Sequence, residues 1–291
     1  MKLFVSALIA ACLAAPALAQ NVTIRFIANE GVHISDGETG VLIDALTWNS
    51  YDGTYALPSD EARAAMINGE APYDDVVALL FTHIHGDHFD PEGAVAISQN
   101  GVTIMGSVQI FDAFIAAGGE EAAITLLEPA EVYCEEDGTD CPTYEDLGNI
   151  TFFPPGLEFE RPFSLGDQQR VLEEQEALAA NVDARPIFHR NGVDHWSYRV
   201  EIGGVSILHL GDTQPQMADF SVWDDTEFDV ILYPYWFAQM PEGVAFLDSR
   251  PDARAIAFHI PAAATPQTIR AGLGDREHLF GEGTSVAIAT E

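Results

Sequence analysis

The chain has 291 residues, of which 47% are hydrophobic, and a formal net charge of −34 at pH 7. A field this negative repels phosphate backbones, which argues against a nucleic-acid partner and against an anionic membrane surface. The acidic residues are spread along the chain instead of forming one tail, so they indicate a solvated acidic surface and leave a small molecule as the expected partner.

The first 19 residues, MKLFVSALIAACLAAPALA, have the pattern of a secretory signal peptide. Lys2 precedes an apolar stretch, and Ala17-Leu18-Ala19 forms a small-residue cleavage site. The stretch is too short for a membrane anchor, so we expect no stable membrane insertion and a periplasmic or secreted protein. Lipoprotein processing at Cys12 is a less favoured alternative, because more apolar residues follow it.

Two cysteines remain after cleavage, Cys134 and Cys141 in VYCEEDGTDCP. In an oxidising compartment, two cysteines that close a short polar loop predict a disulfide. A metal-binding role is less favoured, because the pair is not a CxxC motif. The cysteines fall within an irregular region at about 129–183, which we interpret as an insertion or lid on a single domain spanning residues 20–291.

Before this region, three consecutive strands are followed by alternating helices and strands. Val76 begins the apolar run VVALLF, which predicts a buried strand that leads directly into a histidine cluster. Ser59 is the expected cap of a helix. The expected strands span 22–28, 31–35, 40–45, 76–81 and 102–105, and the expected helices span 59–69, 91–98 and 107–119.

A second series of strands follows, within 184–189, 195–212, 228–236 and 253–261. Three of these four segments lead into a His or Asp. The chain therefore has two similar halves, in which polar side chains recur at strand ends, where loops on a rigid sheet can meet at one site. This order predicts an α/β (α+β) fold.

The stretch THIHGDH places three histidines and one aspartate within residues 83–88. In a core, each of these polar groups would need a buried partner. Zinc, by contrast, binds imidazole nitrogens and carboxylate oxygens. His83 and His85 are expected at one metal, and Asp87 and His88 at a second metal that shares a hydroxide with the first.

THIHGDH, LHLGDT and AIAFHIP, in this order, resemble the signature of the metallo-β-lactamase superfamily over nearly all of the mature chain. The resemblance implies a four-layer αβ/βα sandwich. It also implies that Asp212 bridges both metals and that His259 completes the second site. For the last ligand of the first site, the segment FHRNGVDHW offers His189 and His195, and we favour His189.

Four further residues are candidates for the substrate pocket. In some members of the superfamily the loop at His33 faces the metals. His195 is expected to line the pocket or to bond a ligand. Tyr235 and Trp236 follow a strand within YPYWF, where Pro interrupts the strand end, so they are candidates for a pocket wall.

The resemblance implies a binuclear, zinc-dependent hydrolase with two Zn²⁺ as cofactor, or alternatively Fe or Mn. A metal-bridging hydroxide would attack a lactone, ester, amide or small phosphodiester, with Asp87 as the catalytic residue that orients it. A mononuclear iron enzyme resembling persulfide dioxygenases, and a catalytically silent metal-binding or periplasmic binding protein, remain alternatives. The sequence carries no indication of the oligomeric state.

Overall fold

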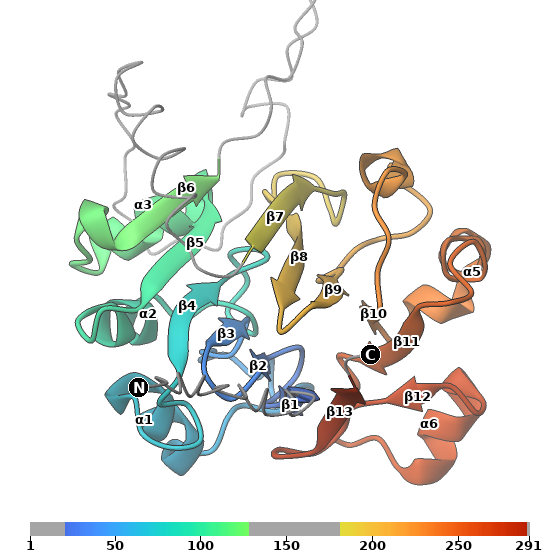
Figure 1. Cartoon of the computed structure of the whole chain (residues 1–291), viewed down its shortest axis with the longest axis horizontal. Helices are drawn as coiled ribbons and strands as arrows, with labels where there is room; N and C mark the ends of the chain where they lie inside the picture. Colours follow the sequence, from blue (N-terminus) through green and yellow to red (C-terminus); the bar gives the residue numbers. More distant parts are fainter. Residues whose placement is uncertain (1–20, 128–180, 290–291) are drawn as a thin grey trace, which may run out of the picture.

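A computed structural model describes residues 21–127 and 181–289 of the chain (Figure 1). The predicted signal peptide, the predicted Cys134–Cys141 disulfide and most of the predicted insertion lie outside the described residues. The last three residues of that predicted region, 181–183, already belong to a strand.

The first half of the chain, together with the C-terminal strand β13, forms a mixed sheet in the order β13-β1-β2-β3-β4-β5-β6. The pairs β1–β2 and β2–β3 are antiparallel, whereas β3 to β6 run parallel. Its strands are β1 (Asn21–Phe26), β2 (Val32–Ser35), β3 (Gly40–Ile43), β4 (Val76–Leu80), β5 (Thr103–Ser107), β6 (Ile124–Leu127) and β13 (Ser285–Ala289).

The second half repeats this plan in a sheet of order β12-β11-β10-β9-β8-β7. The strands β7, β8 and β9 are antiparallel neighbours, and β9 to β12 run parallel. The strands are β7 (Asn181–Pro186), β8 (Trp196–Ile202), β9 (Val205–His209), β10 (Val230–Pro234), β11 (Arg254–Phe258) and β12 (Glu277–His278). The prediction of two similar halves is therefore confirmed.

Helices cover the outer face of each sheet (Figure 1). The first sheet carries α1 (Asp60–Asn68), α2 (Pro91–Ser98) and α3 (Val108–Ala116), and the second carries α5 (Pro241–Asp248) and α6 (Pro266–Leu273). Short 3-10 turns lie at η1 (Glu121–Ala123), η2 (Phe220–Trp223) and η3 (Phe237–Gln239). This arrangement confirms the predicted four-layer αβ/βα sandwich.

Three buried apolar clusters correspond to the three interfaces between the four layers. The central cluster joins both sheets and includes Ile34, Leu80 and Ile207. Phe81 belongs to the cluster under α1 to α3, and Tyr233 to the cluster under α5 and α6. Burial on both faces explains why the central strands are continuously apolar instead of alternating.

Local sequence signals set the ends of the predicted helices. The Ser59 side chain accepts a hydrogen bond from the Ala62 amide at the start of α1, and Gly69 ends that helix with a left-handed backbone. Pro91 occupies the first turn of α2. Within residues 21–127 and 181–289, no helix has the length and apolar character needed to cross a membrane.

Candidate metal centre

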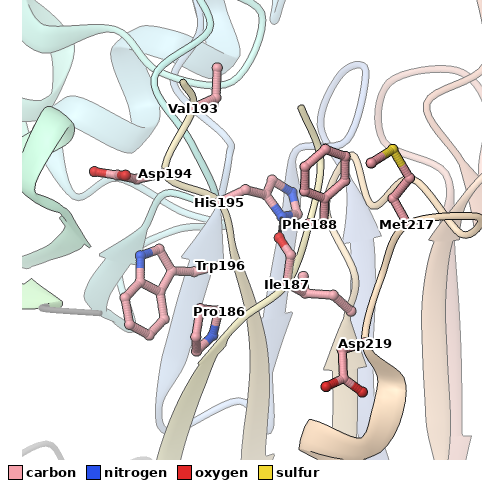
Figure 2. A pocket seen from close by; sticks show the side chains of 9 residues that line it. All are labelled: Pro186, Ile187, Phe188, Val193, Asp194, His195, Trp196, Met217 and Asp219. Carbon is pink, nitrogen blue, oxygen red and sulfur yellow. Dashed lines mark hydrogen bonds between the residues drawn. The ribbon is translucent and has the colours of Figure 1, made fainter. Parts of the chain in front are cut away.

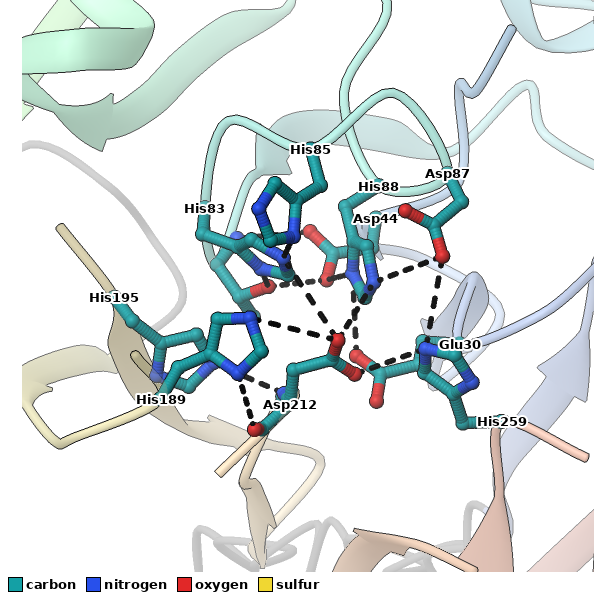
Figure 3. A network of polar contacts seen from close by, with 12 residues as sticks. Glu30, Asp44, His83, His85, Asp87, His88, His189, His195, Asp212 and His259 are labelled. Carbon is teal, nitrogen blue, oxygen red and sulfur yellow. Dashed lines mark hydrogen bonds and ion pairs between the residues drawn. The ribbon is translucent and has the colours of Figure 1, made fainter. Parts of the chain in front are cut away.

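A cluster of histidines and carboxylates lies where the carboxyl ends of the central strands of both sheets meet (Figure 3). The histidine loop follows β4, Asp212 follows β9 and His259 follows β11. His189 comes from the loop that follows β7, three residues beyond the strand end, whereas the sequence predicted that the strand would reach it. Both sheets therefore contribute side chains.

Four of the predicted ligands form a first group, namely His83, His85, His189 and Asp212. His83 Nε2 lies 2.8 Å from His85 Nδ1. Asp212 Oδ2 lies 3.9 Å from both His83 Nε2 and His189 Nε2. Ligand atoms about 2.0–2.1 Å from a tetrahedral zinc are separated by roughly 3.4 Å, so this spacing suits one metal position, called position 1 below.

Asp87, His88 and His259 form a second group beside it. Asp87 Oδ2 lies 3.6 Å from His88 Nε2 and 3.7 Å from His259 Nε2. Asp212 also reaches this group, with its Oδ2 atom 3.5 Å from His88 Nε2 and its Oδ1 atom 2.9 Å from His259 Nε2. We call this group position 2, and Asp212 lies between the two positions.

Asp44, at the end of β3, holds the histidine loop in place. Its carboxylate accepts hydrogen bonds from the Thr82 amide at 2.8 Å and from the Thr82 hydroxyl at 2.5 Å. The same carboxylate lies 2.9 Å from His88 Nδ1. An Nδ1–H that donates to Asp44 leaves His88 Nε2 as the free ligand atom, a common arrangement behind metal-binding histidines.

His195 lies beside the cluster but is not placed as a ligand. Its Nδ1 is 3.0 Å from the Ile187 carbonyl, and its Nε2 accepts the Asp212 amide at 2.9 Å. Both ring nitrogens are therefore used, whereas His189 bonds the Asp212 carbonyl through Nδ1 and leaves Nε2 free. Gly211 permits this contact, because a Cβ there would lie 2.5 Å from His195 Nε2. His195 therefore positions Asp212.

Burial keeps the position 1 imidazoles neutral. Burial lowers the pKa of His83 and of His189, and it lowers the pKa of His85 to about 3. For His83 and His85, the charge of nearby His88 is the next cause. His88 is the exception. Burial also favours its neutral form, but Asp87, Asp212 and Glu30 outweigh burial and raise its pKa. Neutral imidazoles are the form that binds metal, and the carboxylates around His88 attract positive charge.

The donor set fits divalent cations. Among the described residues, His88 Nε2, His189 Nε2 and Asp212 Oδ1 are buried without a hydrogen-bond partner. Four carboxylates are also buried in the cluster, those of Glu30, Asp44, Asp87 and Asp212. Unpartnered buried polar atoms cost free energy, and metal ligation is the common way in which proteins recover it. Imidazole and carboxylate together suit several divalent metals, so the donor set does not by itself select one.

No family model and no curated protein matches the sequence. Solved structures match over most of the chain. An isothiocyanate hydrolase from Delia radicum gut bacteria is 14% identical with a TM-score of 0.55, covering 92% of this chain and 100% of its own.

Two further structures agree with that match. The metallo hydrolase Igni18 from Ignicoccus hospitalis has 15% identity and a TM-score of 0.52, with 93% of this chain and 100% of its own covered. The metallo-beta-lactamase fold protein YhfI from Bacillus subtilis has 11% identity and a TM-score of 0.51, with 92% and 99% covered.

The chain has the metallo-β-lactamase fold. At these identities the likeness establishes the architecture and not the activity.

Asn29 and Glu30, in the turn between β1 and β2 of this metallo-β-lactamase fold, were not expected at the site. The Asn29 amide donates to the Asp87 carbonyl at 3.1 Å and to the Asp87 carboxylate at 3.2 Å, so it orients that carboxylate. The Glu30 side chain is fully buried, and burial raises its pKa. In the sequence, Asn29 and Glu30 are only a polar pair at a turn between two strands, a pattern that is equally typical of a solvated turn.

Aromatic side chains line one side of the cluster. Trp236 lies 4.9 Å from the His259 ring, measured between centroids, and donates to the Thr213 carbonyl at 3.3 Å. Tyr235 packs against Trp236. Tyr55, which the sequence did not single out, lies 4.4 Å from the His259 ring. Burial, followed by the charge of Asp212, raises its pKa, so its hydroxyl stays protonated at neutral pH.

His33 is not brought to the cluster, and the expectation that it lines the pocket is corrected. Its Nε2 atom lies 3.0 Å from Asp75 Oδ1, and its ring packs edge-on against Tyr73. Asp75 immediately precedes β4, so it lies at the opposite end of that strand from the histidine loop. The pairing with Asp75, which cannot be read from the sequence, turns this imidazole away from the metals.

A pocket of about 330 Å³ lies beside the cluster, on the loop that follows β7 (Figure 2). His195 lines this pocket, together with apolar side chains such as Phe188 and Met217. Since the His195 ring is also 5.5 Å from the His189 ring, the pocket adjoins position 1.

Proposed function

We propose that this protein is a metal-dependent hydrolase with a binuclear centre that acts on a small ester, lactone, amide or phosphodiester. The observation that carries the proposal is Asp212, whose carboxylate lies between two complete sets of ligand atoms at the joined ends of both sheets. Two divalent cations here would activate water as the nucleophile and polarise the oxygen of the scissile group.

The protein's own residues prepare this site in two ways. His88 Nδ1 contacts the Asp44 carboxylate, and His189 Nδ1 contacts the Asp212 carbonyl. In both rings Nε2 is therefore the nitrogen that faces the metal positions. The Asn29 amide holds Asp87 Oδ2, the oxygen that faces position 2, so the direction of the carboxylate is fixed and its other oxygen would be the acceptor for a proton of the attacking water. The loops around the cluster bury most of these groups, which strengthens electrostatic interactions inside the site.

The surroundings favour an uncharged substrate with apolar parts. Trp236 and Tyr55 face the His259 side of the cluster, and the net charge of the chain disfavours polyanions. Arg190 lies close enough to the cluster for its positive charge to lower the pKa of His85 and of His189. This single arginine is offset by the many acidic residues of the chain. Esters, lactones and amides are therefore preferred to phosphodiesters. We also propose that the protein is exported, on the basis of its N-terminal sequence.

The test measures both metal content and turnover. We expect about two metal ions per chain by elemental mass spectrometry and hydrolysis of a generic ester or lactone. Asp87→Ala and His85→Ala should each lose about 10²–10⁴-fold in turnover, whereas His278→Ala, on an exposed histidine, should match the wild type. Retained turnover in the Asp87 or His85 variant would remove the proposal, and a single metal per chain would refute the binuclear centre.

A further inference from the structure

Glu30 is a buried carboxylate for which the proposed reaction gives no role. Its side chain has 0% exposure, and neither of its oxygens has a hydrogen-bond partner within residues 21–127 and 181–289. A buried charge without a partner is unfavourable unless a positive group offsets it. In its ionised form, this carboxylate therefore needs a cationic neighbour.

The imidazole of His88 is the nearest basic group, but it is already engaged. Glu30 Oε2 lies 3.3 Å from His88 Nδ1, whereas Asp44 lies 2.9 Å from the same atom. Nδ1 carries at most one proton, so the closer Asp44 takes it. On its other side, Glu30 meets Asp212 and His259, and the ligand atoms of these three residues all lie within 4.8 Å of one another. Figure 3 shows the Glu30 carboxylate directed into this group.

The backbone fixes this direction. The Ile27 amide donates to the Gly31 carbonyl at 2.7 Å, and the Gly31 amide donates to the Ala28 carbonyl at 2.6 Å. A Cβ at Gly31 would lie 2.8 Å from the Asp44 carbonyl oxygen, so the turn is packed closely against the end of β3. The Asn29 carbonyl accepts the His259 amide at 3.0 Å. The turn is therefore tied to two elements that carry the site.

We propose that Glu30 is an additional ligand at position 2. This inference rests on the two-metal centre of the proposed function. Position 1 then offers three imidazoles and the shared Asp212, whereas position 2 offers two imidazoles, Asp212, Asp87 and Glu30. Imidazole-rich sites suit zinc, and carboxylate-rich sites suit harder cations such as Mn²⁺. Position 2 therefore favours Mn²⁺ more strongly than position 1 does.

The experiment compares the wild type, Glu30→Gln and the control Asp75→Asn, a carboxylate-to-amide change outside the centre. Each protein is stripped with a chelator, loaded with one equivalent of Zn²⁺ and titrated with Mn²⁺, with free Mn²⁺ followed by electron paramagnetic resonance. We expect the wild type and Asp75→Asn to bind one Mn²⁺ per chain. Glu30→Gln should bind Mn²⁺ at least tenfold more weakly, while it retains one Zn²⁺ by elemental mass spectrometry.

A second measurement guards against a folding defect. Without metal, Glu30→Gln should melt at or above the temperature of the wild type, because it replaces a group whose charged form is disfavoured by burial, and with Mn²⁺ it should melt at a lower temperature than the wild type. A loss of stability that appears only with Mn²⁺ is not expected from a purely structural role. Equal Mn²⁺ affinity in Glu30→Gln and the wild type would overturn the role of Glu30 and leave the hydrolase proposal intact. A wild type that binds neither metal would overturn both.

Discussion

Asp44 offers the sharpest test of how the metal centre is held together, because one carboxylate satisfies three donors. It accepts the Thr82 amide at 2.8 Å, the Thr82 hydroxyl at 2.5 Å and His88 Nδ1 at 2.9 Å. All three residues are fully buried, so water cannot replace the lost acceptor in Asp44→Ala. The substitution should therefore reduce both folding stability and metal affinity.

The size of the effect follows from these contacts. A hydrogen bond to a charged group contributes about 1.5–3 kcal/mol. Removal of the buried charge itself offsets part of the loss, so we expect a net destabilisation of roughly 3–5 kcal/mol. For a domain of this size the melting temperature falls by about 2–4 °C per kcal/mol, which gives a decrease of roughly 6–20 °C. His88 also loses its orienting acceptor, which lowers metal affinity by about 10–100-fold.

The assay is thermal unfolding by circular dichroism, together with zinc titration against a chromophoric chelator. Asp229→Ala is the matched control, because the Asp229 carboxylate also accepts a backbone amide, that of Ser206 at 2.7 Å, but is exposed. The control should change stability by less than about 1 kcal/mol. If Asp44→Ala melts within about 2 °C of the wild type and binds zinc equally well, Asp44 does not hold the histidine loop as argued.

Three further predictions concern the metals, the pocket and a polar cluster outside the site. Chelation should lower the melting temperature, and zinc at about 100 times its Kd should restore about 2.7 kcal/mol; an unchanged melting curve would contradict a bound metal. Trp236→Ala should raise KM for an ester about tenfold with little change in kcat, because the ring forms a wall beside His259; an unaltered KM would exclude that role. Burial opposes the charge of Asp75, but hydrogen bonds from His33 and Ser35 outweigh it and lower its pKa. Its stabilising effect is therefore complete above the unfolded pKa of 3.8 and is lost as the pH falls through the lower folded value. The difference in stability between the wild type and Asp75→Asn should thus be present at about pH 6 and disappear at about pH 2 in acid titrations of unfolding.

The sequence was most informative where the ligands are close together along the chain. His83, His85, Asp87 and His88 lie in one loop after a continuously apolar strand, so their shared position follows from local pattern alone. Asp212 follows a strand, and parallel strands place their carboxyl ends at one edge of a sheet, so the pattern indicates that it lies at the edge where polar loops meet. Its assignment as a ligand between two metals came from the resemblance to the superfamily.

Glu30 and Tyr55 show where the sequence was not sufficient. Each lies in a turn or loop, and nothing in its local pattern separates it from a solvated surface residue. Glu30 reaches the metal positions only because β1 and β2 lie beside β3 in the sheet, and Tyr55 reaches His259 only because its loop folds back over β11, where the Ala262 amide donates to the Thr54 carbonyl at 2.8 Å. Such contacts depend on tertiary packing, which local propensity does not encode.

Both metal positions take side chains from both sheets, and this has a consequence for the whole fold. Position 1 combines the loop after β4 with His189 and Asp212 from the second sheet, and position 2 combines the same loop with His259. A cation at either position therefore joins two sheets that otherwise meet mainly through an apolar interface. Because that interface is non-directional, it tolerates small shifts between the sheets, whereas ligand atoms a few ångströms apart do not. Bound cations would thus fix the relative placement of the two halves at the edge where the ligand atoms meet.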